Sequence, residues 1–125
     1  MSSRSRILVV DDNVDAADSL AMILTLDGHQ VRCAYAPRDA ITLARSFRPD
    51  VALVDIGLPE MDGYQLAGLL RSAPDTSRIR LLALTGYGRQ QPQGHDPARD
   101  ARFDGYLVKP PDLPALQQAL ARSIA

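Results

Sequence analysis

Five short apolar runs recur along the chain, and the segments between them carry apolar residues at helical spacing. Most of the runs are continuously apolar, which is the pattern of strands buried on both faces of a sheet. The predicted strands are Ile7–Val10, Val31–Ala34, Val51–Val54, Leu81–Leu84 and Tyr106–Val108. Strands that alternate with helices imply an α/β fold, a parallel sheet with right-handed crossovers and helices on both faces.

Four of the intervening segments predict helices with one apolar stripe each. The stripes are Ala17, Leu20, Ala21, Met22 and Leu24; Ala40, Ile41, Leu43, Ala44 and Phe47; Leu66, Leu69 and Leu70; and Leu113, Leu116, Leu120 and Ile124. Gly28 is expected to end the first helix, and Pro49 prevents the second from continuing. Asp112 is placed to cap the start of the last helix.

Length and charge narrow the class of protein. The 125 residues fit a single domain spanning 1–125. The net charge of −1 offers no basic field for nucleic acid or an anionic membrane. No apolar run approaches the ~18 residues of a membrane-spanning helix, and the start does not resemble a signal peptide. The single cysteine, Cys33, is expected in the core and suits a reducing cytoplasm.

Polar groups stand where the predicted strands end, and open parallel sheets carry function at the carboxyl ends of their strands. These groups are Asp11 and Asp12 after the first strand, Asp55 after the third, Thr85 and Gly86 after the fourth, and Lys109 after the fifth. The second strand runs into Ala34 and Tyr35, which offer no obvious chemistry. We therefore expect the second strand at the margin of the sheet.

The three carboxylates would repel one another unless cations lay between them. Two unit charges ~4 Å apart repel by roughly 4 kcal/mol at an effective dielectric of 20. Lys109, the only lysine in the chain, supplies one compact positive charge. A hard divalent cation such as Mg²⁺ would supply two more. Helix capping by Asp11 and Asp12 is an alternative, but it does not explain Asp55 or Lys109.

Asp55 is the candidate nucleophile of this group. An aspartate beside a metal and a lysine is poised to attack phosphorus and form an aspartyl phosphate. The hydroxyl of Thr85 and the backbone N–H beside the small Gly86 can then bind phosphoryl oxygens. His29 and His95 have no partners at metal-ligand spacing, and we expect both to be surface residues.

With these residues in place, the chain resembles the receiver domain of bacterial two-component response regulators over residues 5–123. The residues that carry the resemblance are Asp11, Asp12, Asp55, Pro59, Gly63, Thr85, Gly86, Tyr106, Lys109 and Pro110. The resemblance implies a flavodoxin-like, doubly wound sheet of five parallel strands in the order 2-1-3-4-5. It also implies a cis bond between Lys109 and Pro110 and a cytoplasmic signalling protein that is a monomer or weak dimer.

The resemblance further implies that Asp55 accepts a phosphoryl group from a histidine kinase or histidine phosphotransfer protein. The implied Mg²⁺ ligands are the carboxylates of Asp12 and Asp55, Asp11 mainly through water, and the backbone carbonyl of Gly57. Lys109 would pair with Asp55 and then with its phosphate. Thr85 would move toward the phosphoryl group, and Tyr106 would follow from an outward to an inward rotamer.

One segment departs from the family pattern. Residues 86–101 should hold the fourth helix, but Pro92, Gly94 and Pro97 stand in its interior. There a proline costs ~3 kcal/mol and a glycine about 1 kcal/mol. We predict a fourth helix that is short, displaced or mobile, with any helical turn near 97–101. Arg102 also stands where the family usually has glycine. In receivers the fourth helix commonly belongs to the output and dimer face, so its alteration puts the usual mode of output in question.

Three other functions compete with this interpretation. A Mg²⁺-dependent phosphatase of the haloacid-dehalogenase type also uses a strand-end aspartate, but it needs a second acid where this chain has Gly57. An FMN-binding flavodoxin would have Ser, Thr and Gly in the first loop, where Asp11 and Asp12 would repel phosphate. An interaction module that has lost phosphorylation would not need every expected site residue. The receiver could stand alone or belong to a longer protein such as a hybrid kinase.

Overall fold

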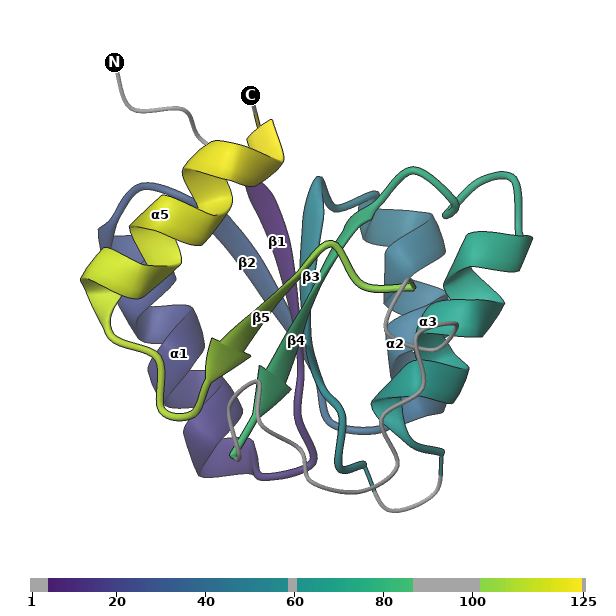
Figure 1. Cartoon of the computed structure of the whole chain (residues 1–125), viewed down its shortest axis with the longest axis horizontal. Coiled ribbons are helices and arrows are strands. Elements are labelled where there is room, and N and C mark those ends of the chain that lie inside the picture. Colours follow the sequence, from purple (N-terminus) through teal and green to yellow (C-terminus); the bar gives the residue numbers. More distant parts are fainter. Residues whose placement is uncertain (1–4, 59–60, 87–101, 125) are drawn as a thin grey trace.

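The computed structural model describes residues 5–58, 61–86 and 102–124, and within them the chain forms one five-stranded sheet (Figure 1). The strands are β1 (Arg6–Val10), β2 (Gln30–Ala34), β3 (Val51–Asp55), β4 (Arg80–Thr85) and β5 (Gly105–Val108). All neighbours are parallel, in the order β2-β1-β3-β4-β5. The predicted fold class is therefore confirmed, the strand ends differ from the prediction by no more than one residue, and β2 lies at the margin.

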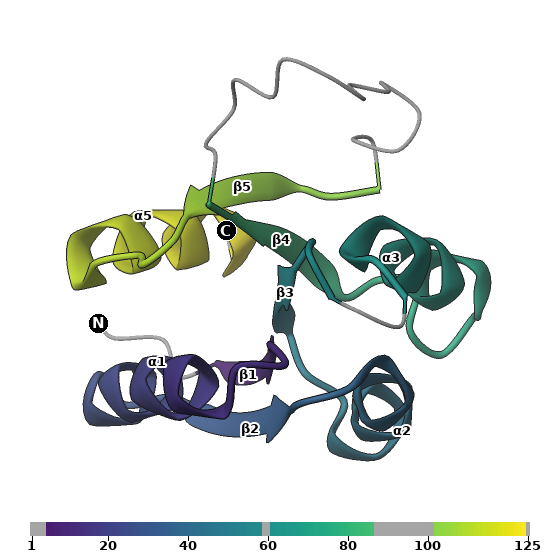
Figure 2. The same cartoon turned by 90° about the horizontal axis from the view of Figure 1, so that it is seen from below.

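Helices cover both faces of the sheet, which explains why its strands are continuously apolar. The helices are α1 (Val14–Leu26), α2 (Pro37–Phe47), α3 (Gly63–Ser72) and α5 (Leu113–Ile124). Figure 2 shows α1 and α5 on one face of the sheet and α2 and α3 on the other. Each face of the sheet has its own hydrophobic core, and alternate residues of β1 belong to the two cores. Leu8 and Val10 pack under α2 and α3, and Ile7 and Val9 pack under α1 and α5.

The helix ends follow the expected local chemistry with one difference. Asp112 caps α5, because its carboxylate accepts the backbone N–H of Ala115 at 2.8 Å. Gly28, with φ of +99°, follows the end of α1 as predicted. The cap of α1, however, is Asn13, whose side chain accepts the N–H of Ala16. Asn13 thus does the capping that was an alternative for Asp11 and Asp12, and it leaves their carboxylates for other partners.

Two predicted stripe residues face solvent instead of the core. Met22 is 65% exposed and Leu69 is 46% exposed. Met22 is about 200° around the helix from both Leu20 and Leu24, which are buried. Leu69 likewise lies about 100° from the buried Leu70. Both predictions were wrong because apolar character alone does not fix which face of a helix meets the sheet.

His29 is buried, so its prediction as a surface residue was wrong. It is only 9% exposed, and its Nδ1 accepts the backbone N–H of Ser5 at 3.0 Å. Its Nε2 lies 3.6 Å from a carboxylate oxygen of Asp27. The turn between α1 and β2 folds beneath the start of β1, and the imidazole satisfies a backbone group there that water does not reach.

Cys33 is half-buried at the margin of the core under α1 and α5, so the expected core position is only partly correct. Burial, followed by the charge of Asp18, raises the pKa of its thiol. Among the described residues, no helix combines the length and apolarity required to cross a membrane. The predictions for residues 87–101, including His95, and for Pro59 lie outside the described residues.

Candidate functional site

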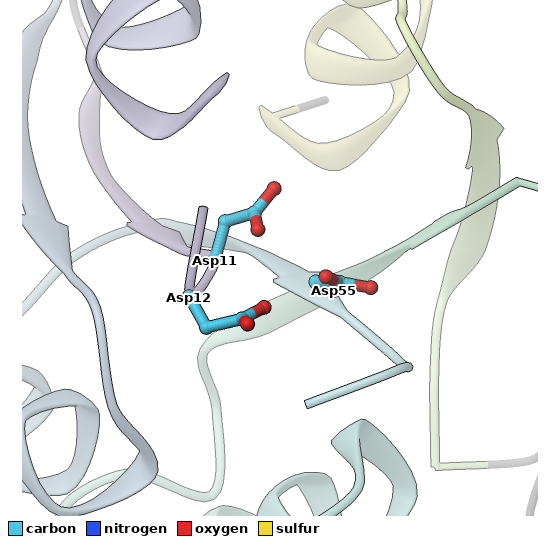
Figure 3. Close-up of side chains that lie close together, drawn as sticks. All are labelled: Asp11, Asp12 and Asp55. Carbon is cyan, nitrogen blue, oxygen red and sulfur yellow. The ribbon is translucent and has the colours of Figure 1, made fainter. Parts of the chain in front are cut away.

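Three carboxylates meet at the carboxyl ends of two neighbouring strands (Figure 3). Asp11 and Asp12 follow β1, and Asp55 is the last residue of β3. The register that pairs Val10 with Val54 brings these strand ends side by side. One carboxylate oxygen of each aspartate lies within 4.8 Å of the others. The structure thus brings together the acidic residues that the sequence placed at one sheet edge.

Lys109 bridges the two more buried carboxylates. Its Nζ donates to Asp11 at 2.8 Å and to Asp55 at 3.3 Å, so the shorter bond goes to Asp11 and not to the expected partner Asp55. The backbone N–H of Lys109 donates to the carbonyl of Thr85 at 2.8 Å, which fixes the root of the side chain beside β4. Burial alone would lower the pKa of Lys109, but Asp11 and Asp55 together outweigh burial and raise it.

The three aspartates differ in their surroundings. The Asp11 side chain is 3% exposed, and it also accepts the N–H of Asn13 at 3.0 Å. The Asp55 side chain is 14% exposed and accepts the N–H of Gly57 at 2.9 Å. Asp12 is exposed, and its carboxylate makes no hydrogen bond or ion pair with the described part of the chain. One lysine therefore balances two carboxylates, and the third remains open to a further cation.

The remaining predicted residues lie in β4, in β5 and in the turns after β3 and β5. Thr85 ends β4 and is 1% exposed, and Gly57 follows β3 in an exposed turn. Tyr106 is half-buried in β5 and contacts Phe103, with ring centroids 5.9 Å apart. The Lys109–Pro110 bond is cis, as expected.

Gly63, the first residue of α3, packs directly against the acceptor loop. A Cβ at this position would lie 2.6 Å from the Cα of Ile56 and 2.8 Å from the carbonyl oxygen of Asp55. The N–H of Gly63 also donates to the carbonyl of Ile56 at 3.1 Å. The glycine is needed for this close approach, which couples the position of α3 to the backbone that carries Asp55.

Replacing Gly63 by Ala should destabilise the protein by about 1–3 kcal/mol, because the backbone on either side of the clash must move. Helix propensity alone would favour the alanine by roughly 1 kcal/mol, so the expected sign is opposite to the propensity effect. Urea denaturation followed by circular dichroism measures the change. Gly86→Ala is the control, since a Cβ there meets nothing within 4 Å. Equal stability of the two variants would contradict the packing argument.

A cleft that the sequence did not indicate opens beside the site. Its volume is about 560 Å³, and it lies between α1 and the turn after β5. Asp11 and Lys109 are among its polar lining residues, and Ile23 and Pro111 are among its apolar ones. The residues of its wall come from distant parts of the chain, so no local pattern predicts it.

Comparison with known proteins identifies the family. The family model described as the response regulator receiver domain matches residues 7–121 of this chain. Protein PilH of Pseudomonas aeruginosa is 33% identical over 121 residues, which are 97% of this chain and 98% of PilH. Response regulator MprA of Mycolicibacterium vanbaalenii is 38% identical over 117 residues, 94% of this chain but 48% of MprA. The chain therefore spans about half the length of MprA.

A solved receiver domain, described as CheY-like, from Methylobacillus flagellatus has the same fold. It superposes with a TM-score of 0.85 at 26% identity, and the match covers 97% of this chain and 99% of that one. These similarities support neither a phosphatase nor a flavodoxin. They agree with the strand order, the acidic cluster and the bridging lysine in assigning a phospho-acceptor type of signalling domain. The chain belongs to the response regulator receiver domain family of two-component signalling.

Proposed function

We propose that the protein accepts a phosphoryl group on Asp55 from a histidine kinase or histidine phosphotransfer protein and signals by changing the proteins it contacts. The observation that carries this proposal is the bridge that Lys109 forms between the buried Asp11 and the partly buried Asp55. Lys109, half-buried and shared by two carboxylates, lies beside Asp55 and can follow the transferred negative charge.

The transfer itself needs no oxidant or further reactant. An oxygen of the Asp55 carboxylate attacks the phosphorus of a phosphohistidine, and the P–N bond breaks with its electron pair going to the imidazole nitrogen. The backbone N–H of Gly57, at 2.9 Å from one carboxylate oxygen, holds the orientation of the side chain. Lys109 then moves its hydrogen bonds toward the phosphoryl oxygens, which carry the new negative charge.

The residues around Asp55 suit Mg²⁺, because the three side-chain ligands that the described part of the chain brings together are all carboxylates. Asp12, Asp55 and the backbone carbonyl of Gly57 would hold the ion directly, and Asp11 would do so mainly through water. Bound Mg²⁺ supplies positive charge that offsets the repulsion between the carboxylates and the incoming phosphoryl oxygens. Asp12, exposed and without a partner among the described residues, is the side-chain ligand most accessible to the ion.

Thr85 and Tyr106 form the proposed switch. The buried Thr85 hydroxyl moves toward the phosphoryl group, and Tyr106 turns from an outward to an inward rotamer in the space that Thr85 leaves. Phosphorylation can shift this equilibrium only if the two states are close in energy beforehand. The protein acts in this scheme as one receiver domain, a monomer or weak dimer, either alone or within a longer protein. Its only chemistry is its own phosphorylation and dephosphorylation.

Acetyl phosphate provides a direct test without the natural donor. Incubation with Mg²⁺ and acetyl phosphate should add one phosphoryl group, measured by intact mass. Removal of Mg²⁺ with a chelator should reduce the yield to background, because the carboxylate repulsion is then no longer offset. Phosphorylation that is equally fast with chelator would contradict the metal requirement, and no added phosphate in any condition would contradict the proposed function.

Asp12→Asn should separate metal binding from stability. Without Mg²⁺ the variant should be more stable by up to about 1 kcal/mol, since one solvent-screened repulsion is removed. Its affinity for Mg²⁺ should fall by at least about tenfold, because even an outer partner of a metal ligand contributes that much. Calorimetric titration and urea denaturation measure the two effects. Asp39→Asn, in the first turn of α2, is the control and should leave the affinity unchanged.

A further inference from the structure

A row of three aromatic rings joins α3 to β5. Tyr64, in the first turn of α3, meets Phe103 edge to face with centroids 5.5 Å apart and an interplanar angle of 77°. Phe103 in turn lies 5.9 Å from Tyr106. Phe103 is 7% exposed and belongs to the core under α2 and α3, and both tyrosines pack against that core. The proposed switch residue thus shares a buried neighbour with α3.

The Tyr64 end of this row and the segment beside Phe103 are tied to the backbone around them. Tyr64 directly follows Gly63, which has no free space against the loop that carries Asp55. The carbonyl of Tyr64 accepts a hydrogen bond from Nη1 of Arg102 at 2.9 Å, and the carbonyl of Arg102 accepts one from Nε of Arg71 at 3.1 Å. The acceptor loop, the start of α3 and the segment before β5 are therefore in continuous contact.

We propose that Tyr64 and Phe103 are positioning residues that couple the first turn of α3 to the orientation of Tyr106. The inference rests on the proposed function, in which Tyr106 changes rotamer when Asp55 is phosphorylated. It adds a second connection to the one through Thr85: a shift of the acceptor loop moves α3, and the ring of Tyr64 transmits this shift through Phe103.

Close packing is the reason that such a row can transmit a displacement. Buried side chains interdigitate at crystal-like density, so a ring cannot turn without its neighbours giving way. Arg102 contributes as well, because its guanidinium lies over Gly68, where a Cβ would be 3.0 Å from Nη1. Arg102 thus holds the backbone before β5 against α3 at a second point, one turn beyond Tyr64. Loss of one ring contact should change the ratio of Tyr106 states by about threefold to tenfold.

Fluorine NMR of protein labelled with 3-fluorotyrosine can follow both ends of the row. The chain has four tyrosines, and single Tyr→Phe replacements assign their signals. Beryllium fluoride with Mg²⁺ serves as the phosphoryl mimic. In the wild type the Tyr64 and Tyr106 signals should respond together. In Phe103→Leu the ratio of Tyr106 states in the presence of the mimic should change by about threefold to tenfold, and the Tyr64 response should weaken.

The chain offers a matched control for loss of a buried ring. Phe47 is also 7% exposed, and its ring faces the guanidinium of Arg6 at 4.5 Å, on the opposite edge of the molecule from Asp55. Phe47→Leu should leave the Tyr106 ratio as in the wild type. Tyr64→Leu, a change at a half-buried position, should reproduce the effect of Phe103→Leu, and Tyr64→Phe should keep the wild-type ratio because it retains the ring.

The outcomes separate this inference from the proposed function. Phosphorylation of the wild type at Asp55, checked by mass, comes first, and its failure would overturn both. If Asp55 is phosphorylated but the Tyr106 ratio in Phe103→Leu and Tyr64→Leu equals that in Phe47→Leu, the coupling alone is overturned. A Tyr64 signal that stays unchanged when Tyr106 responds would also overturn it.

Discussion

Asp55→Asn should reduce phosphorylation by acetyl phosphate to background. The amide is a poor nucleophile, and the substitution removes one of the three negative charges that would hold Mg²⁺. The substitution preserves shape, and the amide oxygen can still accept from Lys109 or Gly57, so the fold should persist. The expected change in the free energy of unfolding is about 1 kcal/mol or less. Loss of phosphorylation without loss of fold would thus assign the chemistry to Asp55.

Intact mass after incubation with Mg²⁺ and acetyl phosphate measures this effect. Asp50→Asn is the matched control. Asp50 directly precedes the first residue of β3, at the end of the strand away from Asp55, and its carboxylate accepts the N–H of Arg6 at 2.9 Å. It should be phosphorylated like the wild type. A phosphate that persists in Asp55→Asn would move the acceptor to a neighbour such as Asp12 and would contradict the assignment.

Lys109→Met should destabilise the protein by about 3 kcal/mol at neutral pH in the absence of Mg²⁺. Asp11 would lose its 2.8 Å partner while its side chain is only 3% exposed. Removal of one member of a buried ion pair leaves an uncompensated charge and typically costs roughly 3–5 kcal/mol. We expect the lower end of that range because the Lys109 side chain is 28% exposed and Asp55 retains the N–H of Gly57. Urea denaturation measures the loss.

Added Mg²⁺ should restore part of the stability that Lys109→Met loses. An ion that binds only the folded protein stabilises it by RT ln(1 + [L]/Kd). Lys109→Arg should retain most of the stability and still bind Mg²⁺, but it should switch poorly because a planar guanidinium replaces a compact ammonium. Full switching of Lys109→Arg would show that a point charge is not required. Equal stability of wild type and Lys109→Met would contradict the buried ion pair.

The pKa of Lys109 sets the pH range in which its ion pairs stabilise the folded protein. Its pKa in the folded protein is raised above the ordinary value of 10.5. The lysine therefore contributes fully below that ordinary value, and its contribution is lost only as the pH rises through the higher value of the folded state. The difference in stability between wild type and Lys109→Met should consequently stay constant between about pH 7 and pH 9. A marked fall within that range would indicate that Lys109 is not held by its two carboxylates.

The sequence by itself determined the strands and the chemistry at their ends. Uninterrupted runs such as Val51–Val54 can be stable only when both faces are covered, which dictates a parallel sheet between helices. A parallel sheet places the carboxyl ends of all its strands at one edge, so Asp11, Asp55 and Lys109 had to lie along that edge. The composition of these strand ends then pointed to phosphoryl chemistry, and the resemblance to receivers supplied the strand order.

Only the tertiary structure decided which groups meet and which face of each helix is buried. It paired Lys109 more closely with Asp11 than with Asp55, buried His29 against Ser5, and turned Met22 toward solvent. It also brought Phe103 between Tyr64 and Tyr106. Local patterns report the spacing of apolar residues along one element, whereas these contacts depend on how distant elements pack. Close packing determines which contacts form and which helix face is buried. The packing energy becomes available only when the whole core has formed.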